Sequence, residues 1–176
     1  DPVLRKRASE ISEITPEIRQ LAEQMIETMI RAKGTGVGLA APQIGQSIRL
    51  FVLRDEISSS SGDFEFAPPE VVINPVFSSP SKEMEESEEG CLSIPGVQIE
   101  VSRPSKIHVR YLNLEGKEVE EDLQGFRARI FMHENDHLNG TLLIDRASPK
   151  VRNKIDLILR KIKSEALKKC LPCSSK

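Results

Sequence analysis

Apolar residues recur at helical spacing near the start of the chain, between residues 18 and 29. The preceding Thr15-Pro16-Glu17 is typical of a helix start, because it supplies a capping hydroxyl, a proline suited to the first position and an acid in the first turn. The pattern predicts an amphipathic helix of about four turns. We expect its apolar stripe to pack in the core, and this stripe comprises Ile18, Leu21, Ala22, Met25 and Met29.

Short apolar or alternating stretches predict strands through the middle of the chain. Residues 48–53 and 71–75 are typical of buried strands, whereas residues 97–101 and 107–112 alternate apolar with polar positions. Residues 113–117 contain Asn and Gly and predict a turn. Because the strands are short and follow one another closely, we expect them to pair in antiparallel sheets.

Three stretches break this pattern. The glycine-rich residues 34–38 should end the first helix, and a phosphate-binding loop is disfavoured there because no Lys-Ser or Lys-Thr pair follows. Residues 58–63 are polar and without periodicity, which predicts a mobile surface loop. Residues 82–89 carry five Glu, and so many acids favour a solvated strand or loop surface.

A helix with apolar positions on several sides is predicted before Asn139-Gly140, since Gly suits the left-handed position after a helix. Pro149 should introduce a last helix that ends in the basic pair Lys168-Lys169. Cys170 and Cys173 have the spacing of redox or zinc motifs but lack a second ligand pair, so we interpret residues 170–176 as a flexible tail. The apolar positions are Phe126, Ile130, Phe131 and Leu138 in the first of these helices and Ile155, Ile158 and Ile162 in the second.

Length and charge narrow the class of protein. A chain of 176 residues fits one domain with its own core. Lys and Arg number 25 against 27 acids, so a general nucleic-acid face is not expected and we predict no specific DNA partner. No apolar run reaches the length of a membrane span and the N-terminus lacks a secretion-signal layout, so we expect a cytoplasmic protein without a membrane partner. The three Cys do not make a disulfide framework.

The strongest chemical signal is the pair His133 and His137. On a helix, residues four apart project from one face, so both imidazoles can bind one metal ion. Glu134 lies beside them and would accept a proton from a metal-bound water. A catalytic site needs a third protein ligand, and Cys91 is the better candidate because thiolate and imidazole suit the same metals. His108 falls on the polar side of an alternating strand, where we expect a solvent-facing residue and not a ligand.

Three motifs together resemble the peptide deformylase family, from Asp1 to about Arg146. They are Gly36-Val37-Gly38-Leu39-Ala40-Ala41-Pro42-Gln43, Glu89-Gly90-Cys91-Leu92-Ser93 and His133-Glu134-Asn135-Asp136-His137. Two departures are visible, since the residue before the first His is commonly Gln and is Met132 here, and family members usually carry several residues before the Asp-Pro that opens this chain.

The resemblance implies hydrolytic removal of the formyl group from the formyl-methionine that begins new polypeptides. It implies a catalytic domain over residues 1–147, with residues 148–169 as a C-terminal helix of the same domain. It also implies Fe²⁺ as the working metal, although the ligands alone do not separate Fe²⁺ from Zn²⁺, Ni²⁺ or Co²⁺. Nascent formyl-methionyl peptides are the expected partners, and the basic C-terminal helix is a candidate for transient ribosome contact.

The short strands and the helices together predict an α+β fold, with antiparallel sheets around a central metal-binding helix and a helix near each end.

Roles for further residues also come from the resemblance. The metal would be held by Cys91, His133 and His137, with Glu134 as the base. Gln43 and the backbone N–H of Leu92 would stabilise the oxyanion, while Glu89 and an Arg103–Asp136 pair would brace the ligands. The substrate would lie against the ring of His133 and against Val37, Gly38, Ile44, Gly90, Phe126, Arg129 and Ile130, with Arg129 at the mouth.

Two rival hypotheses remain at this point. In an ordinary zinc peptidase the third ligand would be Asp156 or Glu165, and Cys91 would be a spare core thiol. In a non-catalytic protein the metal would only stabilise the fold, which predicts four protein ligands.

Overall fold

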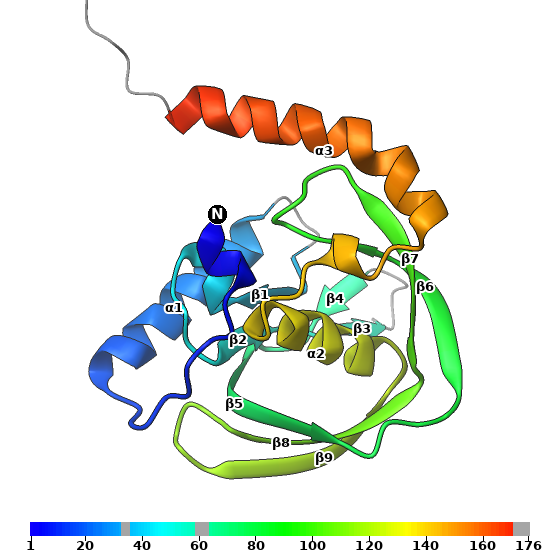
Figure 1. The fold of residues 1–176 in the computed structure, drawn as a ribbon. Helices are drawn as coiled ribbons and strands as arrows, with labels where there is room; N and C mark the ends of the chain where they lie inside the picture. The colour runs from blue at the N-terminus through cyan, green and yellow to red at the C-terminus, as the bar shows by residue number, and fades with distance from the viewer. Residues whose placement is uncertain (33–35, 59–63, 171–176) are drawn as a thin grey trace, which may run out of the picture.

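The computed structural model describes residues 1–32, 36–58 and 64–170, and it confirms an α+β fold with antiparallel sheets and three α-helices in that part of the chain (Figure 1). The helices are α1 (Pro16–Arg31), α2 (Gly125–Leu138) and α3 (Pro149–Cys170), with 3-10 turns η1 (Pro2–Arg5), η2 (Ala41–Ile44) and η3 (Leu143–Asp145). The strands are β1 (Gly38–Ala40), β2 (Leu50–Leu53), β3 (Glu56–Ser58), β4 (Phe64–Phe66), β5 (Glu70–Ser78), β6 (Met84–Gly90), β7 (Gln98–Pro104), β8 (Lys106–Leu112) and β9 (Glu118–Gln124).

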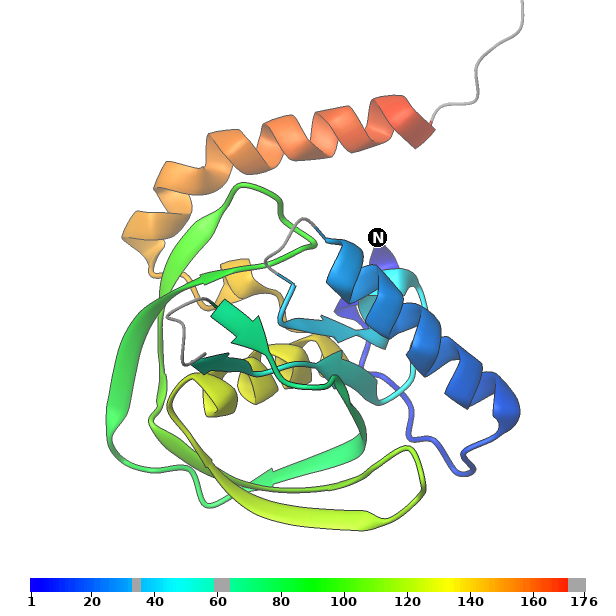
Figure 2. The ribbon, with the colours of Figure 1, turned by 180° about the vertical axis from the view of Figure 1, so that it is seen from behind.

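The main sheet has five strands in the order β1-β2-β5-β8-β9, and every neighbouring pair is antiparallel. β6 and β7 form a separate antiparallel hairpin, in which Gly90 pairs with Gln98 at the connecting end. β3 and β4 form a third, smaller pair. Figures 1 and 2 show α2 lying inside the curve that these strands make, so the helix is enclosed by the sheets.

Helices cover both faces of the sheet, and β2 shows why. Successive strand residues point to opposite faces. Phe51 and Leu53 join the cluster that contains α2, whereas Leu50 and Val52 join the cluster that contains α1. All four side chains are buried because each face has its own helix. Figure 2 shows α1 lying across the β1–β2 side of the sheet.

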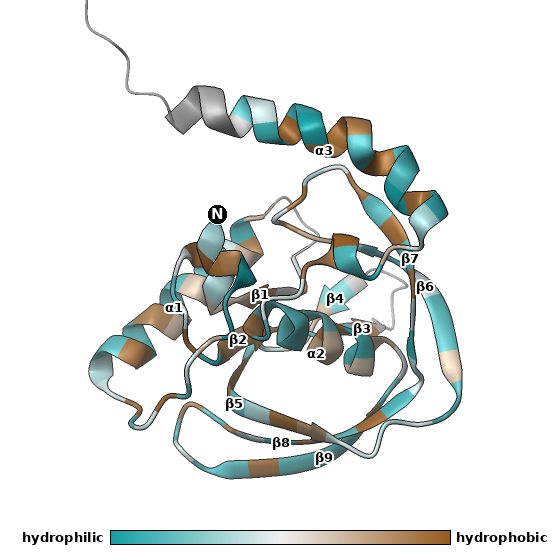
Figure 3. Cartoon of the chain, in the orientation of Figure 1, coloured by the Kyte–Doolittle hydropathy of each residue, from teal (hydrophilic) through white to brown (hydrophobic). Residues whose placement is uncertain are grey.

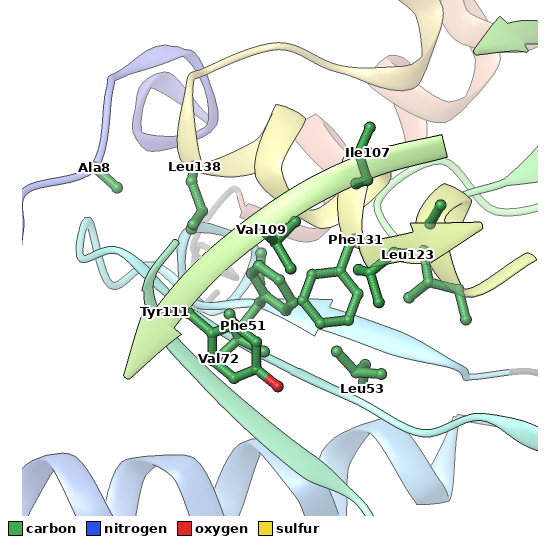
Figure 4. Packing of buried hydrophobic residues seen from close by; sticks show 13 residues of the cluster. Ala8, Phe51, Leu53, Val72, Ile107, Val109, Tyr111, Leu123, Phe131 and Leu138 are labelled. Atoms are coloured by element: carbon green, nitrogen blue, oxygen red, sulfur yellow. The ribbon is translucent and has the colours of Figure 1, made fainter. Parts of the chain in front are cut away.

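Aromatic rings fix α2 against the sheet (Figure 4). Phe131 of α2 meets Phe51 edge to face with ring centroids 5.4 Å apart, and the ring of Tyr111 packs against Phe131 at 5.8 Å. Phe51 and Phe131 are fully buried. Such pairs add packing energy beyond the area they bury, so the helix has one well-defined position on the sheet.

The prediction for the first helix is confirmed. Thr15 caps α1, its hydroxyl accepting from the Ile18 N–H at 3.5 Å, and Pro16 opens the helix. Of the expected stripe, Ala22, Met25 and Met29 are fully buried, and Ile18 and Leu21 pack against the same cluster.

Replacing Met25 by alanine should therefore destabilise the protein strongly. The side chain is 0% exposed, and removing it leaves a cavity between α1 and the sheet that the surroundings fill only in part. We expect a loss of about 2–5 kcal/mol in the free energy of unfolding, measured by urea denaturation. Ile30→Ala on the same helix, where the side chain is 45% exposed, is the matched control and should cost much less.

The last helix packs one side on a third cluster. This cluster joins the β6–β7 connection, β7, η3 and α3, and its buried members are Ile94, Val97, Ile99, Val101, Leu143 and Ile155. Ile155 and Ile162 face the cluster as predicted, but Ile158 is 43% exposed, and Val151 and Leu159 take its place in the stripe. Figure 3 shows the resulting alternation of apolar and polar segments along α3. Ribosome contact through the basic end of this helix stays a prediction.

The polar stretches were predicted less well. Ser58, expected in a loop, is the last residue of β3, and the β3–β4 pair was not foreseen; residues 59–63 lie outside the described residues. The acidic stretch, expected as a solvated strand or loop surface, is strand β6, and its side chains are exposed except for Glu89. Gly34, Thr35 and the tail from residue 171 also lie outside the description. Within the described residues, no helix is long and apolar enough to cross a membrane.

Candidate metal centre

Helix α2 presents three of the candidate residues at one place. The imidazole rings of His133 and His137 have centroids 5.2 Å apart. Glu134, the residue after His133, is buried. The helix begins at Gly125 and ends at Leu138, and Gly140 in the turn that follows has a φ of +72°, the left-handed conformation predicted for that glycine. A Cβ at Gly140 would also lie 2.7 Å from the Arg5 backbone, so the turn after the helix requires glycine twice over.

The third ligand candidate comes from the hairpin. Cys91 directly follows Gly90, the last residue of β6, and its carbonyl accepts from the Ile94 N–H in the turn that leads to β7. Cys91 Sγ lies 3.3 Å from His137 Nε2. Ligand atoms of Cys91, His133 and His137 all lie within 4.8 Å of one another, so one ion between them is within reach of all three.

Other candidates for metal ligands lie elsewhere. Among the described residues no fourth His, Cys, Asp or Glu joins the group of three. His108 is half-buried on β8 and lies 2.8 Å from Asp122 and 2.9 Å from Glu120, which agrees with a surface role. Asp156 pairs with Arg160 one turn along α3, and Glu165 is exposed on that helix. The structure therefore gives no support to a third ligand from α3 or to a four-ligand structural site.

The three ligand residues are electrostatically coupled. Burial alone would raise the pKa of the Cys91 thiol, but hydrogen bonds and charge from His133 and His137 lower it to about 5. Burial would lower the pKa of His133, yet hydrogen bonds with Cys91 and Glu89 raise it to about 10. With these pKa values, Cys91 of the metal-free protein is a thiolate beside the imidazolium of His133. A thiolate is the form of cysteine that binds metals, so binding would release the proton from the ring.

The site also holds two buried polar atoms that have no hydrogen-bond partner within the described ranges of the chain. They are Glu134 Oε2 and His137 Nδ1. Burial raises the pKa of the Glu134 carboxyl. Buried polar groups without partners are rare in folded proteins. In addition, one thiolate and two imidazoles form a set of ligands that suits Fe²⁺, Zn²⁺, Ni²⁺ or Co²⁺. The residues present therefore fit a divalent metal with a water that Glu134 would contact.

Glu89 contacts both the proposed ligand His133 and Arg103. Its Oε2 lies 2.9 Å from His133 Nδ1 and accepts from Arg103 Nη2 at 2.8 Å, while Oε1 accepts from Arg103 Nε at 2.6 Å. With Nδ1 held by a carboxylate, His133 turns Nε2 toward the site. Burial would raise the pKa of Glu89, but Arg103 and His133 lower it to about 2, so it stays ionised.

Asp136 is held from two directions. Arg103 Nη1 donates to its Oδ2 at 3.0 Å, the pair that the resemblance implied. Arg146, after η3, also donates from Nε to Oδ2 at 3.0 Å, and its Nη2 contacts Oδ1. Sequence reasoning did not find Arg146, because nothing local to the Asp-Arg-Ala-Ser-Pro segment indicates a partner on α2.

Gln43 points its amide at the site. Its Oε1 accepts from the Ala40 N–H at 2.7 Å, which leaves the NH₂ group facing the hairpin turn. There Nε2 donates to Ser93 Oγ at 3.1 Å and lies 3.7 Å from Cys91 Sγ. Ser93 was quoted within a motif but given no role. Leu92, whose N–H is the other expected donor, has a side chain that is 39% exposed in the same turn.

A cavity of about 860 Å³ opens onto the centre. Cys91, His133 and Glu134 line it, together with six of the seven predicted substrate residues: Val37, Gly38, Gly90, Phe126, Arg129 and Ile130. Ile44 is not among the described residues that line it, and its side chain is 37% exposed on η2. Arg129, expected at the mouth, is only 6% exposed, and its charge is paired with Glu89.

Gly38 leaves room for the buried carboxylate. A Cβ built there would lie 2.3 Å from Glu134 Oε1, a distance that real contacts do not show. We expect Gly38→Ala to displace Glu134 and to lower kcat by at least about 10-fold while the metal content stays near that of the parent. Gly90→Ala is the comparison variant, because its added Cβ would meet nothing closer than 3.9 Å, and it should lose much less activity. Equal losses in both variants would contradict the steric argument.

Comparisons with known proteins agree with this geometry. The family model for polypeptide deformylase matches residues 1–153. A peptide deformylase of Thermotoga neapolitana is 46% identical over 161 residues, which cover 92% of this chain and 88% of that protein. The crystal structure of peptide deformylase from Thermotoga maritima superposes with a TM-score of 0.74 at 46% identity, covering 85% of this chain and 93% of that one. A Plasmodium falciparum peptide deformylase in complex with an inhibitor gives a TM-score of 0.80 at 32% identity, covering 93% and 96%.

Proposed function

Because this chain belongs to the polypeptide deformylase family, we propose that it hydrolyses the formyl group from the N-terminal formyl-methionine of newly synthesised polypeptides and releases formate. The observation that carries the proposal is the group of Cys91, His133 and His137, with ligand atoms within 4.8 Å, next to the buried Glu134 at a cavity. A metal site with three protein ligands and a buried carboxylate beside it, open to a cavity, suits hydrolysis of an amide.

Cys91, His133 and His137 would hold one divalent metal, with Fe²⁺ as the working ion and Zn²⁺, Ni²⁺ or Co²⁺ as substitutes. When bound, the metal supplies Lewis-acid polarisation of the formyl carbonyl and a water of lowered pKa. With three protein ligands the site keeps a position open for that water, as catalytic sites do and structural sites do not.

Glu134 moves the proton. Its Oε2 is buried and has no hydrogen-bond partner among the described residues, so it is available to accept a proton from the attacking water. Burial raises the pKa of this carboxyl above its ordinary value, which makes the carboxylate a stronger proton acceptor. The same carboxyl then donates the proton to the leaving amine, which becomes the free N-terminus of methionine.

Gln43 and Leu92 would stabilise the oxyanion. The Gln43 carbonyl is fixed on the Ala40 N–H at 2.7 Å, so its Nε2 donors are oriented before the reaction begins. The backbone N–H of Leu92, in the turn after Cys91, would add a second donor. A preorganised donor of this kind is commonly worth about 3 kcal/mol of transition-state stabilisation.

The cavity would take the methionine side chain. Val37, Phe126 and Ile130 supply apolar surface beside the His133 ring. Phe126 is 52% exposed, so it offers a large uncovered ring to an incoming thioether. Apolar walls with a few oriented polar groups are typical of small-ligand sites.

The function is tested by release of formate from a formyl-Met-Ala-Ser peptide. The protein is purified without oxygen and reloaded with Fe²⁺, Ni²⁺ or Zn²⁺, and an acetylated twin of the peptide is the control. We expect turnover of the formyl peptide only, and most with Fe²⁺ or Ni²⁺. Absence of formate with every metal would reject the proposal, and the same mixtures would then be searched for cleaved internal peptide bonds.

A further inference from the structure

The proposed metal centre lies where two hydrophobic clusters meet. The two His come from α2, whose residues Ala128, Ile130, Phe131 and Leu138 belong to the cluster on the main sheet. Cys91 packs against the other cluster, which joins β7, the hairpin turn, η3 and α3. The distance between the thiolate and the imidazoles therefore depends on how the β6–β7 hairpin is attached to α2 (Figure 1).

Charged side chains make this attachment. Glu89, Arg103, Arg129 and Asp136 are 4–8% exposed and form a buried charge network between the hairpin and α2. Arg103 reaches from β7 to Asp136 at 3.0 Å, and Glu89 reaches from β6 to His133 Nδ1 at 2.9 Å. Hydrogen bonds between ions inside a protein are directional and strong, so they fix a distance in a way that apolar contacts do not.

Arg129 is the member of this network that bonds to both strands. Its Nη1 donates to the Val101 carbonyl of β7 at 2.9 Å, and its Nη2 donates to the Glu85 carbonyl of β6 at 2.8 Å. Its Nη1 also donates to Glu89 Oε1 at 2.7 Å, on the carboxylate that holds His133. A rigid guanidinium fork can make these three bonds together, whereas a lysine ammonium presents its donors from a single atom.

These bonds leave Arg129 poorly suited to contact substrate. The residue lines the cavity, but it is 6% exposed, and three of its five N–H groups are already used inside the protein. A peptide carbonyl would have to compete with a buried carboxylate and two strand carbonyls for the same donors.

We propose that Arg129 is a positioning residue for the metal centre, which sets the β6–β7 hairpin and Glu89 relative to α2, and so sets Cys91 relative to His133. The inference rests on the proposed metal site. It differs from the expectation that Arg129 binds substrate, and the two make opposite predictions for metal retention and KM.

The test compares Arg129→Met, Arg129→Lys and the parent protein, each loaded with Ni²⁺. Two quantities are measured: the rate at which excess EDTA removes the metal, and kcat and KM for formyl-Met-Ala-Ser. Arg127→Met is the matched control, because Arg127 lies on the same helix and pairs with Asp55, Glu70 and Glu121, outside the buried charge network. Thermal unfolding of the metal-free proteins records general destabilisation.

We expect Arg129→Met to lose metal about 10- to 100-fold faster than the parent and Arg129→Lys to fall between them. KM should change by less than about twofold while kcat falls, because Arg129 is 6% exposed and its bonded N–H groups face the protein interior. Arg127→Met should keep its metal at the parent rate even where its melting temperature drops.

Metal loss at the parent rate together with a raised KM would overturn the inference and return Arg129 to the substrate site. Equally fast metal loss in Arg127→Met would also overturn it, because general loosening would then explain the effect. Should Arg129→Met not fold, Arg129→Lys decides, since metal loss no faster than in the parent contradicts the inference. If the parent releases no formate, the proposed function fails, whereas the metal-loss comparison still tests the role of Arg129.

Discussion

Replacing Glu134 by glutamine is expected to lower kcat for formyl-Met-Ala-Ser by about 10²–10⁴ while leaving the bound metal in place. Glutamine has nearly the same shape, so the buried site should still form, but its amide cannot accept the proton of the water. In the part of the chain that the structure describes, the buried Oε2 of Glu134 has no hydrogen-bond partner that the substitution would break.

The measurement is formate release together with metal content by mass spectrometry. Glu86→Gln is the matched control, because Glu86 is exposed on β6, and its activity should equal that of the parent. Full activity in Glu134→Gln would reject Glu134 as the base. Loss of metal together with activity would mean that the variant disturbs the ligands and says nothing about proton transfer.

Replacing Cys91 by alanine should remove both the metal and the activity. The thiolate is one of three ligands within 4.8 Å, so its loss leaves two imidazoles and a looser site. Removing a residue that hydrogen-bonds to a metal ligand already lowers the affinity for the metal about 10–100-fold. Removing a direct ligand should lower this affinity more. We expect purified Cys91→Ala to contain little metal and to release no measurable formate.

A double variant, Cys170→Ala with Cys173→Ala, controls for the number of thiols, because it keeps Cys91 and removes the other two Cys of the chain. It should retain both metal and activity. Metal content at the parent level in Cys91→Ala would instead favour the peptidase hypothesis, in which Cys91 is a spare core thiol and an acid on the last helix completes the site.

Features that depend on a few neighbouring residues could be predicted from the sequence. The His133–His137 pair can be predicted from one turn of helix, and the Thr15 cap from three neighbouring residues. The turn at Gly140 can be predicted from that single glycine. The third ligand was less certain, because Cys91 lies in a different element and its distance from the two His depends on tertiary packing. The order of the three motifs, which resembles that of a known family, supplied the support for Cys91 as third ligand that local spacing did not give.

The β3–β4 pair is the strand pairing that the sequence did not predict. It begins in a polar segment without an apolar period, from which a surface loop was expected. The acidic stretch was expected as a solvated strand or loop surface, and tertiary pairing decides between the two. It is strand β6, which bonds along its whole length to β7 although its sequence is dominated by Glu.

Polar contacts between distant elements could not be read from the sequence either. Arg146 on Asp136 and Ser93 on Gln43 join residues that no local rule pairs. Arg129 lines the cavity but is 6% exposed, and the sequence does not show that Glu89 lies 2.7 Å from its guanidinium. The resemblance implied Ile44 as a cavity residue, yet it is not among the described residues that line the cavity, and on η2 it is 37% exposed.

The order of elements along the chain has a consequence for biosynthesis. Cys91 directly follows β6, but His133 and His137 come 42 and 46 residues later, and the Arg146 that bonds to Asp136 comes 55 residues later. While the chain is still being translated, the thiol is made before its partner ligands have emerged. Capture of a metal by all three ligands therefore has to wait until His137 has left the exit tunnel of the ribosome.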